Sequence, residues 1–156
     1  MPFDIEKRMR NGTRKMSDAH SPEGMELTLR TLAMPADTNA SGDIFGGWVM
    51  SQMDLAAAIR ANERCNGRTV TIAANEIVFK KPVQVGDTLC VYTAVDQIGR
   101  SSLVIRIEVW ARRAFSAQRE HVTEARFTMV AVDEAGKPRP VDAVSETAAA
   151  EVPLVS

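Results

Sequence analysis

Five stretches of the chain carry the pattern of apolar and polar residues that is typical of β-strands. The pattern is clearest in residues 101–113, where Leu103, Ile105, Ile107 and Val109 share one face of the predicted strand. The other four predicted strands span residues 25–34, 68–79, 87–97 and 121–133. Short connections separate the last four strands, which favours antiparallel neighbours over helical crossovers.

One long helix is predicted between residue 46 and Gly67, the residue that ends it. Its first part, GGWVMSQMDLAAAI, is apolar on nearly every side and has one carboxylate, Asp54, in its middle. Surface helices normally keep a polar stripe, so this helix is expected to be buried. The order of one strand, the helix and four strands predicts an α+β domain in which one sheet face covers the helix. Because one curved sheet cannot enclose a helix completely, we expect a second subunit to cover the rest, in a dimer or a multiple of dimers.

Length and composition predict one domain with two loosely structured ends. The 156 residues amount to 17.1 kDa, which is too little for two ordinary domains. Residues 1–24 are polar and aperiodic, as expected for a flexible N-terminal arm, and residues 25–140 form the predicted domain. Residues 141–156 are expected to be a tail that frays or forms a short surface helix.

Charge and cysteine content exclude several classes of partner. A net charge of -1 provides no basic surface for nucleic acid. No apolar run is long enough to span a bilayer, so membrane insertion is not expected. The two cysteines, Cys65 and Cys90, are expected to stay reduced, without a disulfide, in a cytoplasmic protein that lacks an apolar N-terminal signal.

Asp54 is the most unusual residue of the predicted helix. An ionised carboxylate in apolar surroundings is costly unless partners satisfy it, which favours a functional role. Alternatively, Asp54 points outward at the helix edge, or bonds to a neighbouring strand or subunit. The sequence of the helix alone leaves both interpretations open.

Two glycines at the helix start favour the functional interpretation. The amides of Gly46 and Gly47 lie in the first turn, where N–H groups are unpaired and the helix dipole is positive. Without side chains, this end allows the close approach of an anion or of a carbonyl oxygen that becomes one. Gly47 and Asp54 are two turns apart on one face, roughly 10 Å along the axis. The alternative for the glycine pair is close packing of the helix on the sheet.

The loop before the helix adds polar candidates. Asp43 is predicted to be the N-cap or an acid of the first turn, which is a structural role. Asn39 has two possible roles, a turn-forming side chain or a group that orients water or polarises a carbonyl. His20 lies in the arm, and His121, at a strand start, is expected to be a surface residue.

Several catalytic signatures are absent from the chain. It contains no G-x-S-x-G, no H-E-x-x-H, no paired C-x-x-C and no glycine-rich phosphate loop with its lysine. Serine hydrolases, zinc enzymes and kinases are therefore excluded, and no metal site is expected.

The segments RTLAMP, DTNASGDIFGGWVMSQMD, VTIAANEIVFKKPVQVGD, IGRSS and IEVW resemble those of hotdog-fold acyl-CoA thioesterases, most closely the bacterial YciA type. The resemblance covers residues 26–140 and implies a helix wrapped by an antiparallel sheet of about five strands, in homodimers that assemble as trimers of dimers. It also implies that Asp54 is the general base or nucleophile and that Asn39 completes the site from the other subunit. The amides of Gly46 and Gly47 would polarise the thioester carbonyl.

Coenzyme A, which is part of both substrate and product, is implied to lie along the dimer interface. The positions that correspond to its contacts are Ile72, Ala73, Ala74, Arg100, Ser101 and Ser102. Arginine and hydroxyl groups suit phosphate oxygens. Lys80 and Lys81 could add charge, but a solvated strand end is the favoured interpretation. Asn75 departs from the family, where an acid is frequent, and leaves the local hydrogen bonding in doubt.

Hydrolysis of acyl-CoA to free fatty acid and coenzyme A, without metal or cofactor, is the first hypothesis. Activation of water by Asp54 and an anhydride route through Asp54 predict the same residues, and oxygen-18 incorporation into the carboxylate would separate them. The alternative is a non-catalytic acyl-CoA binding or sensing module. A dehydratase would need a histidine beside the helix, and this stretch has none.

Overall fold

The computed structural model describes residues 21–143, so most of the predicted arm and tail, residues 1–20 and 144–156, lies outside the described residues. The elements follow one another as β1 (Glu26–Leu32), the short 3-10 helix η1 (Pro35–Asp37), α2 (Gly46–Cys65), β2 (Thr69–Phe79), β3 (Thr88–Ile98), β4 (Ser102–Arg112) and β5 (Arg119–Ala131). The five predicted strands and the long helix are confirmed, with bounds that differ by at most two residues at each strand end.

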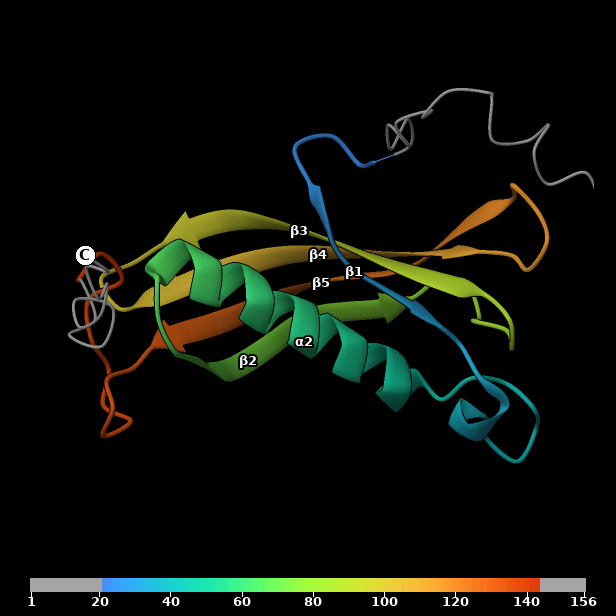
Figure 1. Ribbon diagram of the computed structural model, residues 1–156, viewed down its shortest axis with the longest axis horizontal. Helices are drawn as coiled ribbons and strands as arrows, with labels where there is room; N and C mark the ends of the chain where they lie inside the picture. Colours follow the sequence, from blue (N-terminus) through green and yellow to red (C-terminus); the bar gives the residue numbers. More distant parts are fainter. Residues whose placement is uncertain (1–20, 144–156) are drawn as a thin grey trace, which may run out of the picture.

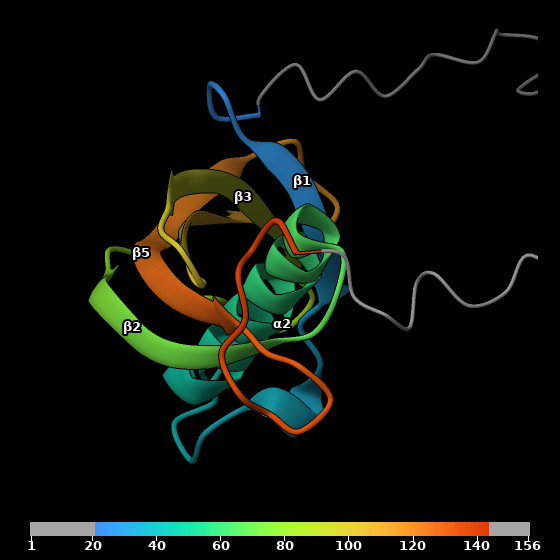
Figure 2. The same cartoon turned by 90° about the vertical axis from the view of Figure 1, so that its left-hand side faces the viewer.

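The five strands form one antiparallel sheet in the order β1-β3-β4-β5-β2, so β1 and β2 are its edges (Figure 1). Viewed end-on, the sheet curves around α2 (Figure 2). The consecutive strands β3, β4 and β5 pair through short turns, as the short connections predicted. The predicted α+β architecture, with one sheet face over the helix, is confirmed.

The main core lies between α2 and the concave face of the sheet. Every second residue of β4 is fully buried there, as its alternation predicted: Leu103, Ile105, Ile107 and Val109. The helix contributes its own buried stripe of Val49, Met53, Ala56, Ala57, Ala61 and Cys65. Alanines on this stripe allow the helix to approach the sheet closely.

No helix among residues 21–143 is long and apolar enough to cross a membrane.

The other side of α2 is not covered. Met50, Leu55 and Ile59 expose 39%, 52% and 39% of their surface. The prediction that the helix is buried on nearly every side is therefore wrong for a single chain, because one sheet contacts only one side of a helix. The exposed side is apolar all the same, which is the surface that the expected second subunit would cover.

The face of the sheet that points away from α2, here called the outer face, has a smaller cluster. Cys90 and Tyr92 are buried on it beside Trp110. Cys65 belongs to the main core on the opposite face, so the two free thiols lie on different sides of the sheet. His121 is not the surface residue that we expected, because its ring is half-buried and stacks on Trp110 with ring centroids 4.7 Å apart.

A buried ion pair ties the β4–β5 connection to the loop before β3. The carboxylate of Asp87, 1% exposed, accepts hydrogen bonds from the Arg113 guanidinium and from the Gln84 amide. Arg113 also donates to the carbonyl of Pro82. Since each partner satisfies the other in a site closed to water, loss of one leaves a buried charge without compensation.

We therefore expect Asp87→Ala to lower the free energy of unfolding by about 3 to 5 kcal/mol in urea titration. The control is Asp142→Ala, which breaks the exposed pair with Arg64 and should cost about 1 kcal/mol or less. Equal, small losses for the two variants would show that the buried pair does not stabilise the fold.

Candidate active site

Asp54 lies on the exposed side of α2, beside the edge strand β2. The hydroxyl of Thr71 donates a hydrogen bond to Asp54 Oδ1 at 2.6 Å, and Thr71 Oγ1 also lies 3.5 Å from Met129 Sδ. Two turns further along the helix, Asn62 Oδ1 accepts hydrogen bonds from the amide and the hydroxyl of Thr69. The carboxylate is therefore held in one orientation by the strand, with its second oxygen left for other contacts.

Sequence reasoning missed Thr71. Thr71 lies inside a predicted strand. The alternation of apolar and polar residues in that strand does not show which residue of α2 lies opposite Thr71. The register between a helix and an adjacent strand depends on the connection from Asn66 to Arg68, where Asn66 adopts a left-handed conformation with φ of 51°. The signal that could have identified Thr71 is a hydroxyl-bearing residue two or three positions into the strand that follows a helix with an acid in its middle.

The surroundings of Asp54 differ from our expectation. Its side chain is exposed in a single chain, so the prediction of a carboxylate enclosed by apolar groups is wrong at this level of assembly. The alternative, an acid at the helix edge bonded to a neighbouring strand, is confirmed by the contact with Thr71. Apolar side chains nevertheless flank it on the same side of the helix, Met50 one turn before and Leu55 directly after.

The start of α2 offers unpaired amides. Phe45 is the N-cap, and its side chain makes no capping hydrogen bond. Its carbonyl accepts from the amides of Trp48 and Val49 at 3.1 and 3.3 Å, while within the described chain no acceptor lies on the amides of Gly46 or Gly47. Two N–H groups at the positive end of the helix dipole are thus available to a ligand.

The two glycines have different surroundings. A Cβ atom added to Gly47 would meet nothing within 4 Å, whereas one added to Gly46 would lie 3.6 Å from the Phe79 ring. Close packing on the sheet therefore does not explain Gly47. Gly47 opens toward the same side of the helix as Met50 and Asp54, all three of them exposed.

Asp43 is not the N-cap, contrary to our prediction. Thr38 and Ile44 form an isolated antiparallel bridge, and the Ile44 side chain, 7% exposed, is anchored in the core. This anchor keeps the chain extended past Asp43, so the helix starts only after Phe45. The Asp43 side chain remains exposed.

Asn39 organises the loop before the helix. Its Oδ1 accepts hydrogen bonds from the amides of Ser41 at 2.9 Å and Asp43 at 3.1 Å, which confirms the turn-forming interpretation. The amide nitrogen of the same side chain makes no hydrogen bond with the described residues and keeps both of its donors. No hydrogen bond joins Asn39 to Asp54 within the described part of one chain.

The two segments predicted to contact coenzyme A lie at the same end of the sheet. Ser102 of β4 and Val70 of β2 both pair with Val130, so only strand β5 separates the turn at residues 99–102 from the start of β2. Ile72, 62% exposed, forms a bulge in β2 directly after Thr71. The structure therefore brings residues 72–74 beside the Asp54 site and the turn within two strand spacings of it, roughly 10 Å.

The polar groups of this turn are accessible. The carbonyls of Arg100 and Ser101 accept from the amides of Val141 and Ala131, which fixes the backbone. The Arg100 side chain is exposed and makes no ion pair with any described residue. Val141 itself is 2% exposed, so the packed part of the chain extends at least to this residue.

The end of β2 is charged and solvated. Lys80 pairs with Glu124 at 3.1 Å. Both Lys80 and Lys81 are exposed, as we expected for a solvated strand end. Next to Asn75, Glu76 has a left-handed φ of 58° and binds Arg126, which also binds Asp96. The Arg126 guanidinium donates hydrogen bonds to Asp96 and to Glu76, and these bonds, the one to Asp96 first, raise its pKa.

No group of three or more metal-ligating His, Cys, Asp or Glu side chains occurs among residues 21–143. The groups that the structure does bring together are a carboxylate with a fixed orientation, unpaired helix amides and a nearby apolar strand edge. These groups suit the polarisation of a carbonyl and the activation of a nucleophile.

Comparison with known proteins gives concordant results. The family model "Thioesterase superfamily" matches residues 41–113. The acyl-CoA thioester hydrolase YciA of Salmonella typhimurium is 54% identical over 125 residues, 78% of this chain and 93% of that protein.

Two solved structures extend the match to three dimensions. The hexameric hotdog-fold thioesterase Cj0915 of Campylobacter jejuni superposes with a TM-score of 0.70 at 44% identity, over 74% of this chain and 89% of that one. HI0827 is a hexameric broad-specificity acyl-coenzyme A thioesterase that was solved with one aspartate replaced by alanine. It superposes with a TM-score of 0.72 at 51% identity, over 74% of this chain and 86% of that one. The chain therefore belongs to the YciA-type acyl-CoA thioester hydrolases of the thioesterase superfamily and has their hotdog fold.

Proposed function

We propose that the protein hydrolyses acyl-CoA thioesters with Asp54 as the general base or nucleophile and the amides of Gly46 and Gly47 as carbonyl-binding donors. The observation that carries the proposal is the position of these groups on one exposed side of α2, with the Asp54 carboxylate oriented by Thr71. An aspartate-to-alanine mutant of HI0827, a thioesterase of the same family, supports an aspartate at the centre of the reaction.

The proposed chemistry uses the amides at the start of α2 and the carboxylate two turns further along the same face. The thioester carbonyl oxygen accepts from the glycine amides, which stabilise the negative charge that develops on it, a kind of donor worth about 3 kcal/mol. Asp54 either removes a proton from the attacking water or attacks the carbonyl carbon itself. The carbon–sulfur bond then breaks, and the acyl group leaves as a carboxylic acid, with one water consumed and coenzyme A released as the thiol.

The working unit of the proposal is a homodimer, within a trimer of dimers. Exposed apolar side chains on the open side of α2 and on the edge strand β2 support it: Met50, Leu55, Ile59, Ile72, Val78 and Phe79. The relatives Cj0915 and HI0827 are hexameric. In such a dimer the partner covers the exposed helix side, which encloses Asp54 in apolar groups, and the free donors of Asn39 reach the site across the interface.

Coenzyme A is proposed to lie along β2 at Ile72, Ala73 and Ala74, with its phosphates at the turn of Arg100, Ser101 and Ser102. The exposed guanidinium of Arg100 supports this assignment, since a free arginine binds phosphate bidentately. We also propose a cytoplasmic location, in agreement with the free thiols of Cys65 and Cys90.

The substitution Asp54→Asn should lower kcat by about 100-fold or more without loss of folding, because the amide can neither accept a proton nor attack. The assay mixes protein, acyl-CoA and a thiol reagent and follows release of free coenzyme A. Asp43→Asn, which changes another exposed acid eleven residues earlier, is the matched control and should keep full activity. Turnover by the Asp54 variant above a tenth of normal would refute the assignment, and no thiol release by the unmodified protein would favour a sensor.

The substitution Gly47→Ala should separate stability from activity. Alanine is favoured over glycine in a helix by up to about 1 kcal/mol, and the added Cβ meets no atom within 4 Å, so thermal stability should rise or stay unchanged. The same methyl group occupies the space where the thioester carbonyl is proposed to bind, so kcat/KM should fall by about tenfold or more. Unchanged kcat/KM would mean that substrate does not approach this amide.

The substitution Thr71→Val keeps the shape of the side chain and removes the hydrogen bond to Asp54. A hydrogen bond to a charged group contributes about 1.5 to 3 kcal/mol, so kcat should fall by about tenfold or more while KM changes little. Thr71→Ser retains the hydroxyl and should restore most of the rate. A Val variant as active as the Ser variant would show that the strand does not position the carboxylate.

A further inference from the structure

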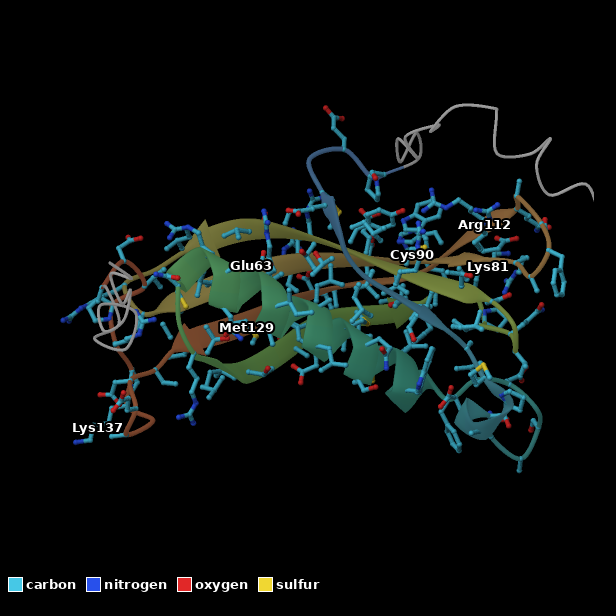
Figure 3. The ribbon with its side chains drawn as sticks, viewed as in Figure 1. Glu63, Lys81, Cys90, Arg112, Met129 and Lys137 are labelled. Carbon is cyan, nitrogen blue, oxygen red and sulfur yellow. The ribbon has the colours of Figure 1, made fainter. Side chains whose placement is uncertain are left out.

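After β5 the chain runs past the C-terminal end of α2 (Figures 1 and 2). Val132 and Pro138 form an isolated antiparallel bridge, which closes the loop between them and leads into a segment at residues 138–143. Figure 3 shows Lys137, directly before this segment, at the end of the molecule opposite Arg112. The segment therefore lies at the end of the sheet where the helix stops.

Arg139 anchors this segment to α2. Its Nη2 donates a hydrogen bond to the carbonyl of Cys65, the last residue of the helix, at 3.1 Å. The other guanidinium nitrogens donate to the carbonyls of Val132, Pro140 and Ala143 at 3.4, 3.0 and 2.7 Å. The last carbonyls of a helix lack donors within the helix and lie at the negative end of its dipole, so a guanidinium group is favourable here. One side chain thus joins the end of β5, the end of α2 and the 138–143 segment.

Gly67 leaves room for this guanidinium. A Cβ atom added to Gly67 would overlap Arg139 Nη2 and lie 3.3 Å from Arg139 Cζ. Gly67 does not adopt a positive φ, so its backbone conformation alone does not require glycine. Any side chain at position 67 therefore forces the guanidinium away from the Cys65 carbonyl.

The same segment holds the turn at residues 99–102. The side chain of Val141 is buried in the main core, and its amide donates a hydrogen bond to the carbonyl of Arg100 at 2.9 Å. From the end of β5, the amide of Ala131 donates to the carbonyl of Ser101 at 2.8 Å. The Arg100 side chain is exposed, so its direction depends on the backbone that these bonds hold.

We infer that Arg139 is a positioning residue for acyl-CoA. It holds the 138–143 segment, the segment holds the turn, and the turn directs Arg100 toward the phosphates of coenzyme A. This inference rests on the proposed function, in which the turn contacts those phosphates. A preorganised turn avoids the cost of ordering it at binding, so Arg139 acts on the affinity for substrate and not on the chemical step at Asp54.

The test compares kcat and KM for acyl-CoA with those for the matching S-acyl-N-acetylcysteamine thioester, which lacks the phosphates. Arg139→Gln should raise KM for acyl-CoA by about threefold or more with kcat nearly unchanged, because the substrate must then order the turn itself. The KM of the truncated thioester should stay the same. Partial unfolding lowers kcat through a smaller active fraction but does not raise KM for one substrate alone, so this comparison separates positioning from stability.

Three further variants complete the experiment. Gly67→Ala displaces the guanidinium but keeps its charge, so it should reproduce the rise in KM and serves as the test if Arg139→Gln folds poorly. Arg64→Gln removes only the exposed ion pair between α2 and Asp142, and this matched control should leave KM unchanged. Arg100→Gln should raise KM for acyl-CoA, and its combination with Arg139→Gln should raise KM little further, because Arg139 acts through Arg100.

An equal loss of kcat/KM for both substrates in Arg139→Gln and Gly67→Ala would overturn the inference, since Arg139 would then serve only the stability of the fold. A full additional rise in KM in the double variant would also overturn it, because the two arginines would then act independently. A rise in KM for Arg100→Gln with no change for Arg139→Gln would refute the inference and leave the proposed function intact. An unchanged KM for Arg100→Gln would instead show that the proposed phosphate contact is wrong, and the inference would fail with it.

Discussion

The sheet of one chain covers only one side of α2, and this constraint determines where the proposed functional groups lie. Small and branched residues on the covered side allow close contact with β3, β4 and β5. The uncovered side carries the unpaired amides at the helix start, Asp54 in the middle, and the exposed apolar side chains of Met50, Leu55 and Ile59. Because a helix repeats every 3.6 residues, one sequence places a stabilising face and the proposed reactive face on the same helix.

Much of the fold was predictable from the sequence because its signals are local. Alternation defined β4, the apolar run defined α2, and short connections implied antiparallel pairing of β3, β4 and β5. The glycine pair and Asp54 were also recognisable, since their chemistry depends only on position within one helix. These features need no knowledge of what packs against them.

The remaining features depend on contacts between distant residues. The anchoring of Ile44 in the core moved the helix start past Asp43, although the capping preference of Asp43 is strong. The orientation of Asp54 depends on Thr71, seventeen residues later, through a register that alternation does not encode. The burial of the helix was overestimated because one sheet contacts only one side of it, and the other side is apolar but exposed in a single chain.

The interruptions of β2 have a consequence for the free edge of the sheet. Its pairing with β5 shifts once at Ile72 and again between Asn75 and Val78, where Glu76 turns into the left-handed region. Such bulges twist a strand locally and break the even row of amides and carbonyls that a neighbouring strand would need. Another polypeptide can therefore hydrogen-bond to this edge only in short stretches and in one alignment, which protects an apolar rim from open-ended aggregation.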